Sequence, residues 1–318
     1  MPSSTIDTFT DPDAYHASIR HAHAEGIVTG RGTFEAELTK IRLDRLSLHR
    51  SNETLPRVAY STVDTRLFLI VFPISRGSPI SINGLGSSLG DIVVFRAGSE
   101  GYNRSSTACQ WGSIAVTHED LATVGQALVG RELNAPVTHR IKPPPLLLSR
   151  LLNLHEAAGH LAKTAPDILA KSEVARAMEQ ALVEAMISCL AGGEAEEPRK
   201  AFIHHATVMR RLEEAVEANS DAEGPLYMME FAAAVGVSYK TLRACCQEHL
   251  GMGPKRYLWL RRMHLARRAL RRADPETTTV TEIATDHGFW ELGRFSVAYR
   301  SLFGESPSTA LHRPPDDP

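Results

Sequence analysis

Long apolar runs, paired cysteines and a signal-peptide pattern are all missing from this chain of 318 residues. No hydrophobic stretch approaches the roughly 20 residues that a membrane-spanning helix needs. The first residues, MPSSTIDTFTDPDAYHASIRHAHAEG, are polar and contain no apolar signal-peptide core. The cysteines are four in number and lack the spacing of a disulfide framework: Cys109, Cys189, Cys245 and Cys246. We therefore expect a cytoplasmic protein with reduced cysteines and no membrane partner.

Patterns that carry catalysis or hold a cofactor are missing as well. In HEAAGH, His155 and His160 are five residues apart, which places them about 140° apart on a helix and not on one face, as zinc binding requires. His21 and His23 lack a matching downstream set of Glu and His ligands. INGLGSSLG is not a dinucleotide fingerprint, because no GxGxxG opens a helix there. No triad or carboxylate pair stands out, so we expect no enzyme, no metal and no cofactor.

The charge of the chain is uneven. Length and composition predict about two ordinary globular domains, with 43% hydrophobic and 23% charged residues and a formal net charge of −2. Between Ser238 and Arg272, however, ten Lys or Arg residues stand against a single acid, Glu248. A solvated helix face is the alternative, but most such faces alternate in sign and this one hardly does. The distribution favours a nucleic-acid partner.

A period-two pattern runs from about Thr33 to Val116. Short apolar runs at 67–72 and 92–95 are separated by glycine and serine clusters, as is typical of an antiparallel sandwich or barrel. Residues 1–30 are expected to be loosely structured or weakly helical, and His118 is expected to open a helix. We place the β-rich domain at residues 1–143.

Two helices are expected after the prolines at 143–145, the second with Ser172 as its N-cap. The apolar stripe of that second helix repeats every three or four residues and consists of Val174, Met178, Leu182, Ala185 and Cys189. The stripe needs a partner, either the sandwich or a second subunit, so residues 144–190 form a candidate dimerisation or coupling region. Residues 191–200, which include AGGEAEEP, predict a linker.

The strongest signal is a tandem repeat in the last third of the chain. EFAAAVGVSYKTLRACCQEHLGMGP (230–254) and EIATDHGFWELGRFSVAYRSLFGESP (282–307) each predict a short helix, a glycine turn, a longer helix and a Gly-x-x-Pro stop. They indicate helix-turn-helix motifs at about 228–250 and 280–303. A helix from Pro254 to about Arg272 would be roughly 28 Å long, close to the ~34 Å turn of B-DNA.

Residues 201–313 resemble the DNA-binding domain of the AraC/XylS family of bacterial transcription regulators. The match is carried by Leu242, Gly251, Pro254, Tyr257, Leu258, Arg262, Met263, Ala266, Leu270, Ile283, Ala284, Gly288, Phe289, Phe295, Tyr299, Phe303, Gly304 and Pro307. More weakly, the stretch 33–143 resembles the cupin-like, arabinose-binding-type sensor domain at the front of such regulators. The resemblance implies an α+β protein. An N-terminal antiparallel β-sandwich with flanking helices would precede an all-α domain of two helix-turn-helix subdomains joined by a long helix.

In function, the resemblance implies a sequence-specific regulator that reads two successive major grooves of double-stranded DNA. It also implies a regulator that responds to an unidentified small-molecule effector and activates transcription with RNA polymerase, in the cytoplasm at the nucleoid. The apolar stripe of the helix at 172–190 adds the expectation of a homodimer. A cupin-type metal enzyme carrying a DNA-binding module and a nonspecific architectural DNA-binding protein are the alternatives. Metal content after purification tests the first, and competition with random DNA tests the second.

The family's base-reading positions fall on Lys240, Arg243 and Ala244 in the first copy. Lys240 and Arg243 are three residues apart, share a helix face and can reach guanine O6 and N7, unless they touch phosphate alone. In the second copy the corresponding region offers Leu292, Gly293, Arg294, Ser296 and Val297. Leu292 and Val297 can touch thymine methyls but cannot donate a hydrogen bond. We predict that the second copy contributes more to positioning than to base specificity.

Two further sets of residues are predicted to bind. Contacts to the DNA backbone are expected from Ser238, Tyr239, Thr241, Lys255, Arg256, Arg261 and Arg262. The arginines of the connecting helix should face out, and we expect about two to four phosphate contacts among the cations of 255–272. In the sensor, an anionic effector would suit a pocket formed by Arg42, Tyr60, Arg96 and Trp111. Exposed arginines and core aromatics are the alternative interpretation of those four.

Overall fold

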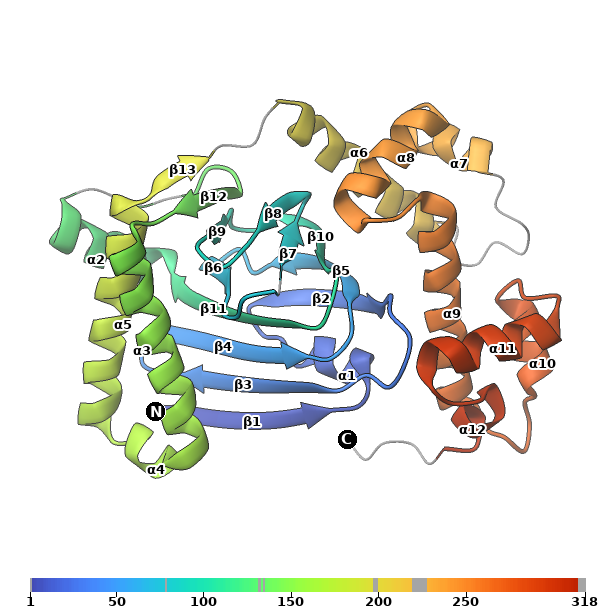
Figure 1. Ribbon diagram of the computed structural model, residues 1–318, viewed down its shortest axis with the longest axis horizontal. Helices are drawn as coiled ribbons and strands as arrows, with labels where there is room; N and C mark the ends of the chain where they lie inside the picture. The colour runs from blue at the N-terminus through green and yellow to red at the C-terminus, as the bar shows by residue number, and fades with distance from the viewer. Residues whose placement is uncertain are drawn as a thin grey trace.

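The computed structural model describes residues 2–77, 79–130, 133, 135–196, 200–218 and 228–313. A β-rich half and a helical half lie side by side, with α9 running along their boundary (Figure 1). The strands are β1 (Ser3–Phe9), β2 (Ala22–Val28), β3 (Ala36–Arg42), β4 (Leu46–Glu53), β5 (Arg57–Val63), β6 (Leu67–Pro73), β7 (Ile80–Ile82), β8 (Leu85–Ser87), β9 (Ile92–Phe95), β10 (Glu100–Ser105), β11 (Cys109–Thr117), β12 (His139–Lys142) and β13 (Glu194–Glu196). The helices are α1 (Pro12–Ala17), α2 (His118–Val129), α3 (Pro145–Thr164), α4 (Pro166–Leu169), α5 (Ser172–Gly192), α6 (Lys200–Ala218), α7 (Met228–Val235), α8 (Tyr239–Leu250), α9 (Pro254–Arg272), α10 (Val280–Asp286), α11 (Leu292–Phe303) and α12 (Pro307–Leu311).

Two antiparallel sheets form the N-terminal sandwich and confirm the expected fold class. One has the order β1-β3-β4-β11-β6-β9-β12-β13, and the other has the order β2-β5-β10-β7-β8. Alternate side chains of both sheets meet in a buried core that includes Leu38, Val63, Ile82 and Phe95. The period-two pattern arises because successive strand residues point to opposite faces.

Helices α3 and α5 cover the outer face of the larger sheet (Figure 1). Leu182, Ala185 and Cys189 of the predicted stripe are buried in a cluster with residues of α3 and of that sheet. The sandwich is therefore the partner of this stripe. Ser172 is the first helical residue and not the N-cap, which is Lys171 with no side-chain capping bond.

The first thirty residues are regularly folded, so the expectation of a loose segment was wrong. β1 pairs with β3 as an edge strand, α1 starts at an Asp11 cap, and β2 pairs with β5. The polar composition of this segment is typical of an edge strand as well as of a loose segment. An edge strand is only partly covered, and charged residues on it discourage pairing with other molecules. The expected linker also differs. Its residues Glu194–Glu196 form β13, another polar edge strand, paired with β12.

Helices α6 to α12 form the C-terminal half, with helix-turn-helix pairs α7–α8 and α10–α11 (Figure 1). Both recognition helices, α8 and α11, end at a glycine in the left-handed region, Gly251 with φ 71° and Gly304 with φ 75°. This conformation favours glycine and satisfies the last carbonyl groups of a helix. The connecting helix α9 begins and ends where predicted. In the described ranges, no helix has both the length and the apolarity that crossing a bilayer requires.

Candidate nucleic-acid interface and sensor cavity

The first recognition helix, α8, is held by a cap and a buried face. Ser238 is its N-cap, and the Ser238 Oγ accepts a hydrogen bond from the Thr241 N–H at 3.1 Å. The inward face is buried and consists of Leu242, Cys245, Cys246, His249 and Leu250. The outer face exposes three of the predicted base-reading residues: Lys240, Arg243 and Ala244. Among the described residues, neither cation has an ion-pair partner, so both side chains can contact an external anion.

The second recognition helix, α11, presents an apolar outer face. Val297 is 73% exposed, and Trp290 in the preceding turn is 71% exposed. A Cβ placed on Gly293 would meet nothing within 4 Å, so the helix surface is open there. Arg294 is exposed but pairs with Glu291 at 2.6 Å. The two remaining predicted contacts are half-buried: Leu292 and Ser296.

Many of the α9 cations are paired inside the molecule, which differs from the expectation that they face out. Arg261 pairs with Glu213 of α6, a buried acid. Arg262 lies over the Phe289 ring, 5.5 Å from its centroid. Three further arginines of α9 bind acids from other elements: Arg267 and Arg271 with Asp11, and Arg268 with Asp13. Two of the predicted phosphate contacts, Lys255 and Arg256, are exposed, as are Ser238 and the terminal Arg272, whereas Tyr239 and Thr241 are half-buried.

These ion pairs are part of a contact between the two halves. The hydroxyl groups of Tyr102 from β10 and Tyr257 from α9 both donate to Glu213. Burial raises the pKa of Tyr257, so its hydroxyl keeps the proton that it donates. A third link joins His264 Nε2 to the Val28 carbonyl oxygen at 3.0 Å. Side chains of β2, β5 and β10 share one apolar cluster with the helical half, so the sandwich packs directly on the helical half.

A cavity of about 80 Å³ lies inside the sandwich. Among its lining residues, three buried nitrogens have no hydrogen-bond partner: His16 Nε2, His49 Nδ1 and Arg104 Nε. Burial lowers the pKa of His16 to about 4 and that of His49 to about 2, so both imidazoles are neutral near pH 7. A neutral imidazole nitrogen donates or accepts according to its tautomer. Buried polar atoms without partners are rare in proteins, and two of these belong to imidazole side chains that line the cavity, whereas Arg104 Nε lies on the side of α8.

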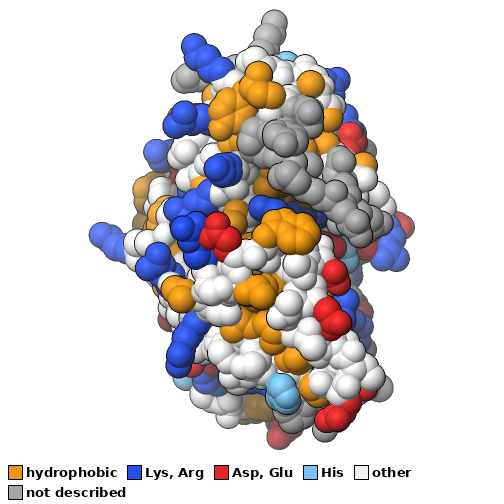
Figure 2. Space-filling view, turned by 90° about the vertical axis from the view of Figure 1, so that its right-hand side faces the viewer, with side chains coloured by type: hydrophobic (Ala, Val, Ile, Leu, Met, Phe, Trp, Pro, Cys, Tyr) orange, Lys and Arg blue, Asp and Glu red, His pale blue; other side chains and the backbone are white. Residues whose placement is uncertain are grey.

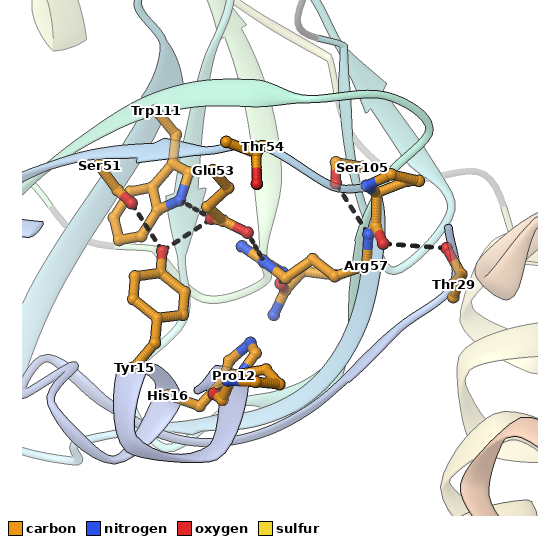
Figure 3. Close-up of polar contacts among 12 residues, drawn as sticks. Pro12, Tyr15, His16, Thr29, Ser51, Glu53, Thr54, Arg57, Ser105 and Trp111 are labelled. Atoms are coloured by element: carbon orange, nitrogen blue, oxygen red, sulfur yellow. Dashed lines mark hydrogen bonds and ion pairs between the residues drawn. The ribbon is translucent and has the colours of Figure 1, made fainter. Parts of the chain in front are cut away.

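One wall of the cavity is supported by a buried carboxylate (Figure 3). Glu53 accepts hydrogen bonds from Trp111 Nε1 at 2.6 Å, from the Tyr15 hydroxyl at 2.7 Å and from Arg57 Nε at 2.6 Å. Burial favours a raised pKa for Glu53, but the charge and hydrogen bond of Arg57 outweigh burial and hold that pKa below its usual value. The charge of Arg57 is thus already compensated inside the protein.

The predicted effector residues lie in three different places. Trp111 lines the cavity, whereas Arg42 and Arg96 are exposed and outside it. Tyr60 lies at the boundary of the two halves, with its ring 5.0 Å from that of Tyr102. Sequence reasoning missed His16, His49, Arg57 and Arg104, which come from α1, β4, β5 and β10. No local motif joins them; charged or histidine residues inside apolar strands were the available signal.

Arg104 connects the cavity to the first recognition helix. Arg104 is among the residues that border the cavity, but its guanidinium points toward α8, with Nη1 3.0 Å and Nε 3.5 Å from a Cβ placed on Gly251, the C-cap of α8. The C-terminus of a helix carries a partial negative charge, which attracts a guanidinium. Strand β10 therefore borders the cavity at Asn103 and Arg104 and touches the end of α8 through the Arg104 guanidinium.

Within the described ranges, no three His, Cys, Asp or Glu side chains come together in a way that could hold a metal ion. His155 is buried and lies 2.9 Å from Arg50 Nη1, whereas His160 is exposed. His21 is buried and stacks on His49 with ring centroids 3.8 Å apart, whereas His23 is exposed. In each pair, one histidine is therefore structural and the other faces solvent.

Comparison with known proteins places the helical half in a family. A family model described as a helix-turn-helix domain matches residues 231–313. The "Probable thc operon regulatory protein" of Rhodococcus erythropolis is 45% identical over 94 residues, which are 30% of this chain and 28% of that protein. "XylDLEGF operon transcriptional activator 2" of Pseudomonas putida is 31% identical over 113 residues, 36% of this chain and 71% of that protein.

Solved structures similar to the chain include two regulators. The AraC-like transcriptional activator CuxR aligns with 89% of this chain and 100% of its own, at 15% identity and a TM-score of 0.43. An AraC-type regulator from Chromobacterium violaceum aligns with 32% of this chain and 89% of its own, at 31% identity and a TM-score of 0.29. On the sequence matches to its helix-turn-helix half, the chain belongs to the AraC/XylS family of transcription regulators.

Proposed function

We propose that the protein is a sequence-specific DNA-binding transcription regulator whose binding depends on a small-molecule effector. The observation that carries the proposal is the outer face of α8, where Lys240 and Arg243 are exposed on a capped, well-packed recognition helix. Relatives of the helical half are named as operon regulators and activators. We therefore propose activation as the direction of control, with RNA polymerase as the partner.

Base reading by Arg243 is tested with Arg243→Ala and a set of operators mutated one base pair at a time. A guanine contact predicts a loss of about 1–3 kcal/mol at one position, with relaxed discrimination there and little change elsewhere. Arg272→Ala is the matched control, because Arg272 is an exposed cation at the end of α9 and away from α8. An equal loss on every operator for Arg243→Ala would reduce its role to phosphate binding.

The cavity in the sandwich is the proposed effector site. Its volume is about 80 Å³, so the effector is a small molecule unless the walls move. The unpartnered nitrogens of His16 and His49 favour a polar effector that can form a hydrogen bond with a neutral imidazole. A thermal-shift screen of small metabolites on the whole chain identifies it, since a ligand of the folded state raises the melting temperature.

Arg104 is the proposed link between effector and DNA. An effector that shifts β10 at the cavity wall changes how the Arg104 guanidinium sits against the C-terminus of α8. Arg104→Met keeps the length of the side chain but removes its charge and its donors. In this variant we expect DNA affinity to lose its dependence on the effector while unliganded binding persists. If DNA binding by Arg104→Met depends on the effector as it does in the unaltered protein, Arg104 does not couple the cavity to α8.

We also propose that the protein is a homodimer without catalytic activity. The α5 stripe is covered by the sandwich, so self-association would use another surface, such as the one around the exposed Leu146 of α3. Sedimentation velocity of the whole chain over a range of concentrations tests the dimer. Stoichiometric transition metal after purification would instead favour an enzyme of the cupin type.

A further inference from the structure

A groove runs between α11 and the loop that follows β2 in the sensor half. One opening, of about 480 Å³, is lined by Gly293, Val297 and Ser301 on the outer face of α11 and by Arg31 of the loop. A second opening, of about 350 Å³, shares Arg31 and Ser301 and adds Arg256 of α9. A residue of the sensor half thus lies directly beside the second recognition helix.

The charged side chains that line this groove are all cations: Arg31, Arg256 and Arg294. Arg31 and Arg256 are exposed, and among the described residues neither has an acidic partner. Figure 2 shows Lys and Arg side chains gathered along one side of the face that carries the helical half, beside hydrophobic side chains along its middle. The groove is therefore complementary to an anion.

The loop that carries Arg31 is fixed against the helical half. Before the loop, the Val28 carbonyl oxygen bonds His264 of α9. After it, the chain touches the end of α11, because a Cβ on Gly304 would lie 3.3 Å from Thr33 Oγ1. Both ends of the loop contact the DNA-binding half, so Arg31 is held beside α11.

The dimensions of B-DNA indicate which anion would lie against this groove. The major groove is about 12 Å wide and a helix with its side chains is about 10–12 Å across, so a seated helix has a phosphate strand on each side. A cation that flanks the outer face of the helix then meets that strand. Guanidinium groups bind phosphate oxygens through paired hydrogen bonds.

We propose that Arg31, together with Arg256, binds a phosphate strand of the duplex that α11 enters, so that the sensor half contributes directly to DNA affinity. The proposal rests on the proposed DNA-binding function and adds a contact from outside the helix-turn-helix domain. Since α11 offers few polar groups of its own, these flanking cations position it on the duplex. Movement of the sensor half then changes affinity without altering any base-reading residue.

The test measures affinity against salt concentration for the whole chain on an operator and on a random duplex. Arg31→Ala should weaken binding to both duplexes by the same factor and reduce the slope of log K against log salt by about 0.9, the value for one phosphate. Adding Arg256→Ala should reduce the slope by about 1.8 in total. Arg42→Ala is the matched control, an exposed sensor cation outside the groove, and should leave the slope unchanged.

Three results would overturn the proposal. An unchanged slope in Arg31→Ala excludes a phosphate contact. Tighter DNA binding in Arg31→Ala means that the loop obstructs the duplex. An unchanged slope accompanied by weaker self-association in sedimentation means that a second copy of the chain fills the groove. If the unaltered protein does not bind duplex DNA, the proposed DNA-binding function is wrong. If the unaltered protein binds duplex DNA and Arg31→Ala binds it with the same affinity and salt dependence, only the proposed phosphate contact of Arg31 is wrong.

Discussion

In the first helix-turn-helix unit the recognition helix starts at a side-chain cap and exposes Lys240 and Arg243, whereas in the second it starts without such a cap and exposes Val297. The buried positions of the two copies nevertheless correspond, since Leu242 and Phe295 occupy the same place and both are buried. Packing constrains the inward face of each helix, because a lost or added methylene in a core is costly. The outward face is free of that constraint and has diverged.

The two units also differ in how they contact the N-terminal sandwich. Gly251 at the end of α8 lies against Arg104, which lines the cavity, whereas Gly304 at the end of α11 lies against the loop of Arg31. Both contacts are made at a helix C-terminus, but the first comes from strand β10 and the second from the loop between β2 and β3. An effector in the cavity would therefore act on the first unit more directly than on the second.

Acid sensitivity is the largest expected difference between the units. His249 of α8 is buried where α11 has Leu302, and burial lowers the pKa of His249 to about 4, against ~6.5 in an unfolded chain. As pH falls, the unfolded chain therefore takes up the proton first. The contribution of His249 to the free energy of unfolding is therefore complete above pH 6.5 and is lost as the pH falls from 6.5 to 4. The total loss is on the order of 3 kcal/mol.

His249→Leu should flatten that loss, as measured by denaturant unfolding at pH 7 and pH 5. Leu302→His is the reciprocal variant and should introduce an acid-sensitive position into the second unit. If His249→Leu keeps the original pH profile, the buried histidines of the sandwich carry the whole effect and the two units are alike in this respect.

Capping is the next difference. Ser238→Ala removes the Oγ that accepts the Thr241 N–H and should cost about 1 kcal/mol of unfolding free energy. Glu291→Ala at the start of α11 has no capping bond to lose and breaks only an exposed pair with Arg294, so its cost should stay below about 0.5 kcal/mol. Urea unfolding at constant m value measures both. Equal costs would show that the helix starts are equivalent in solution.

The smallest effect concerns how the second unit reads DNA. If Val297 contacts a thymine methyl, replacing thymine by deoxyuridine in its half-site should weaken binding by about 0.8 kcal/mol, or roughly fourfold. The same replacement in the half-site of α8 should have no effect, and Val297→Ala should abolish the sensitivity. An equal loss of affinity from the replacement in both half-sites would contradict the prediction that α11 recognises DNA through an apolar contact.

The sequence predicted those local features that depend only on residues close together in the chain. The bounds of α9 and the Ser238 cap follow from a proline, a capping hydroxyl and a 3.6-residue period. The β-rich region followed from its period of two. The N-terminal strands were missed because edge strands carry a weak apolar signal.

The positions of the binding residues were less predictable. The basic run in α9 predicts an exposed surface, but Arg268 pairs with Asp13, 255 residues away in the chain. The cavity was missed for the same reason, because its unpartnered nitrogens come from separate elements. No local pattern contains either arrangement.

By itself, the sequence determined the two helix-turn-helix units, the helix between them and the family, because periodicity, caps and glycine turns are properties of short segments. The tertiary structure alone decided which cations remain free for DNA. Asp11, Asp13 and Glu213 neutralise most of the α9 arginines, while Arg31 joins the second unit from the sensor half. Ion pairing depends on distance in space, and residues far apart in the chain come within that distance only in the folded protein.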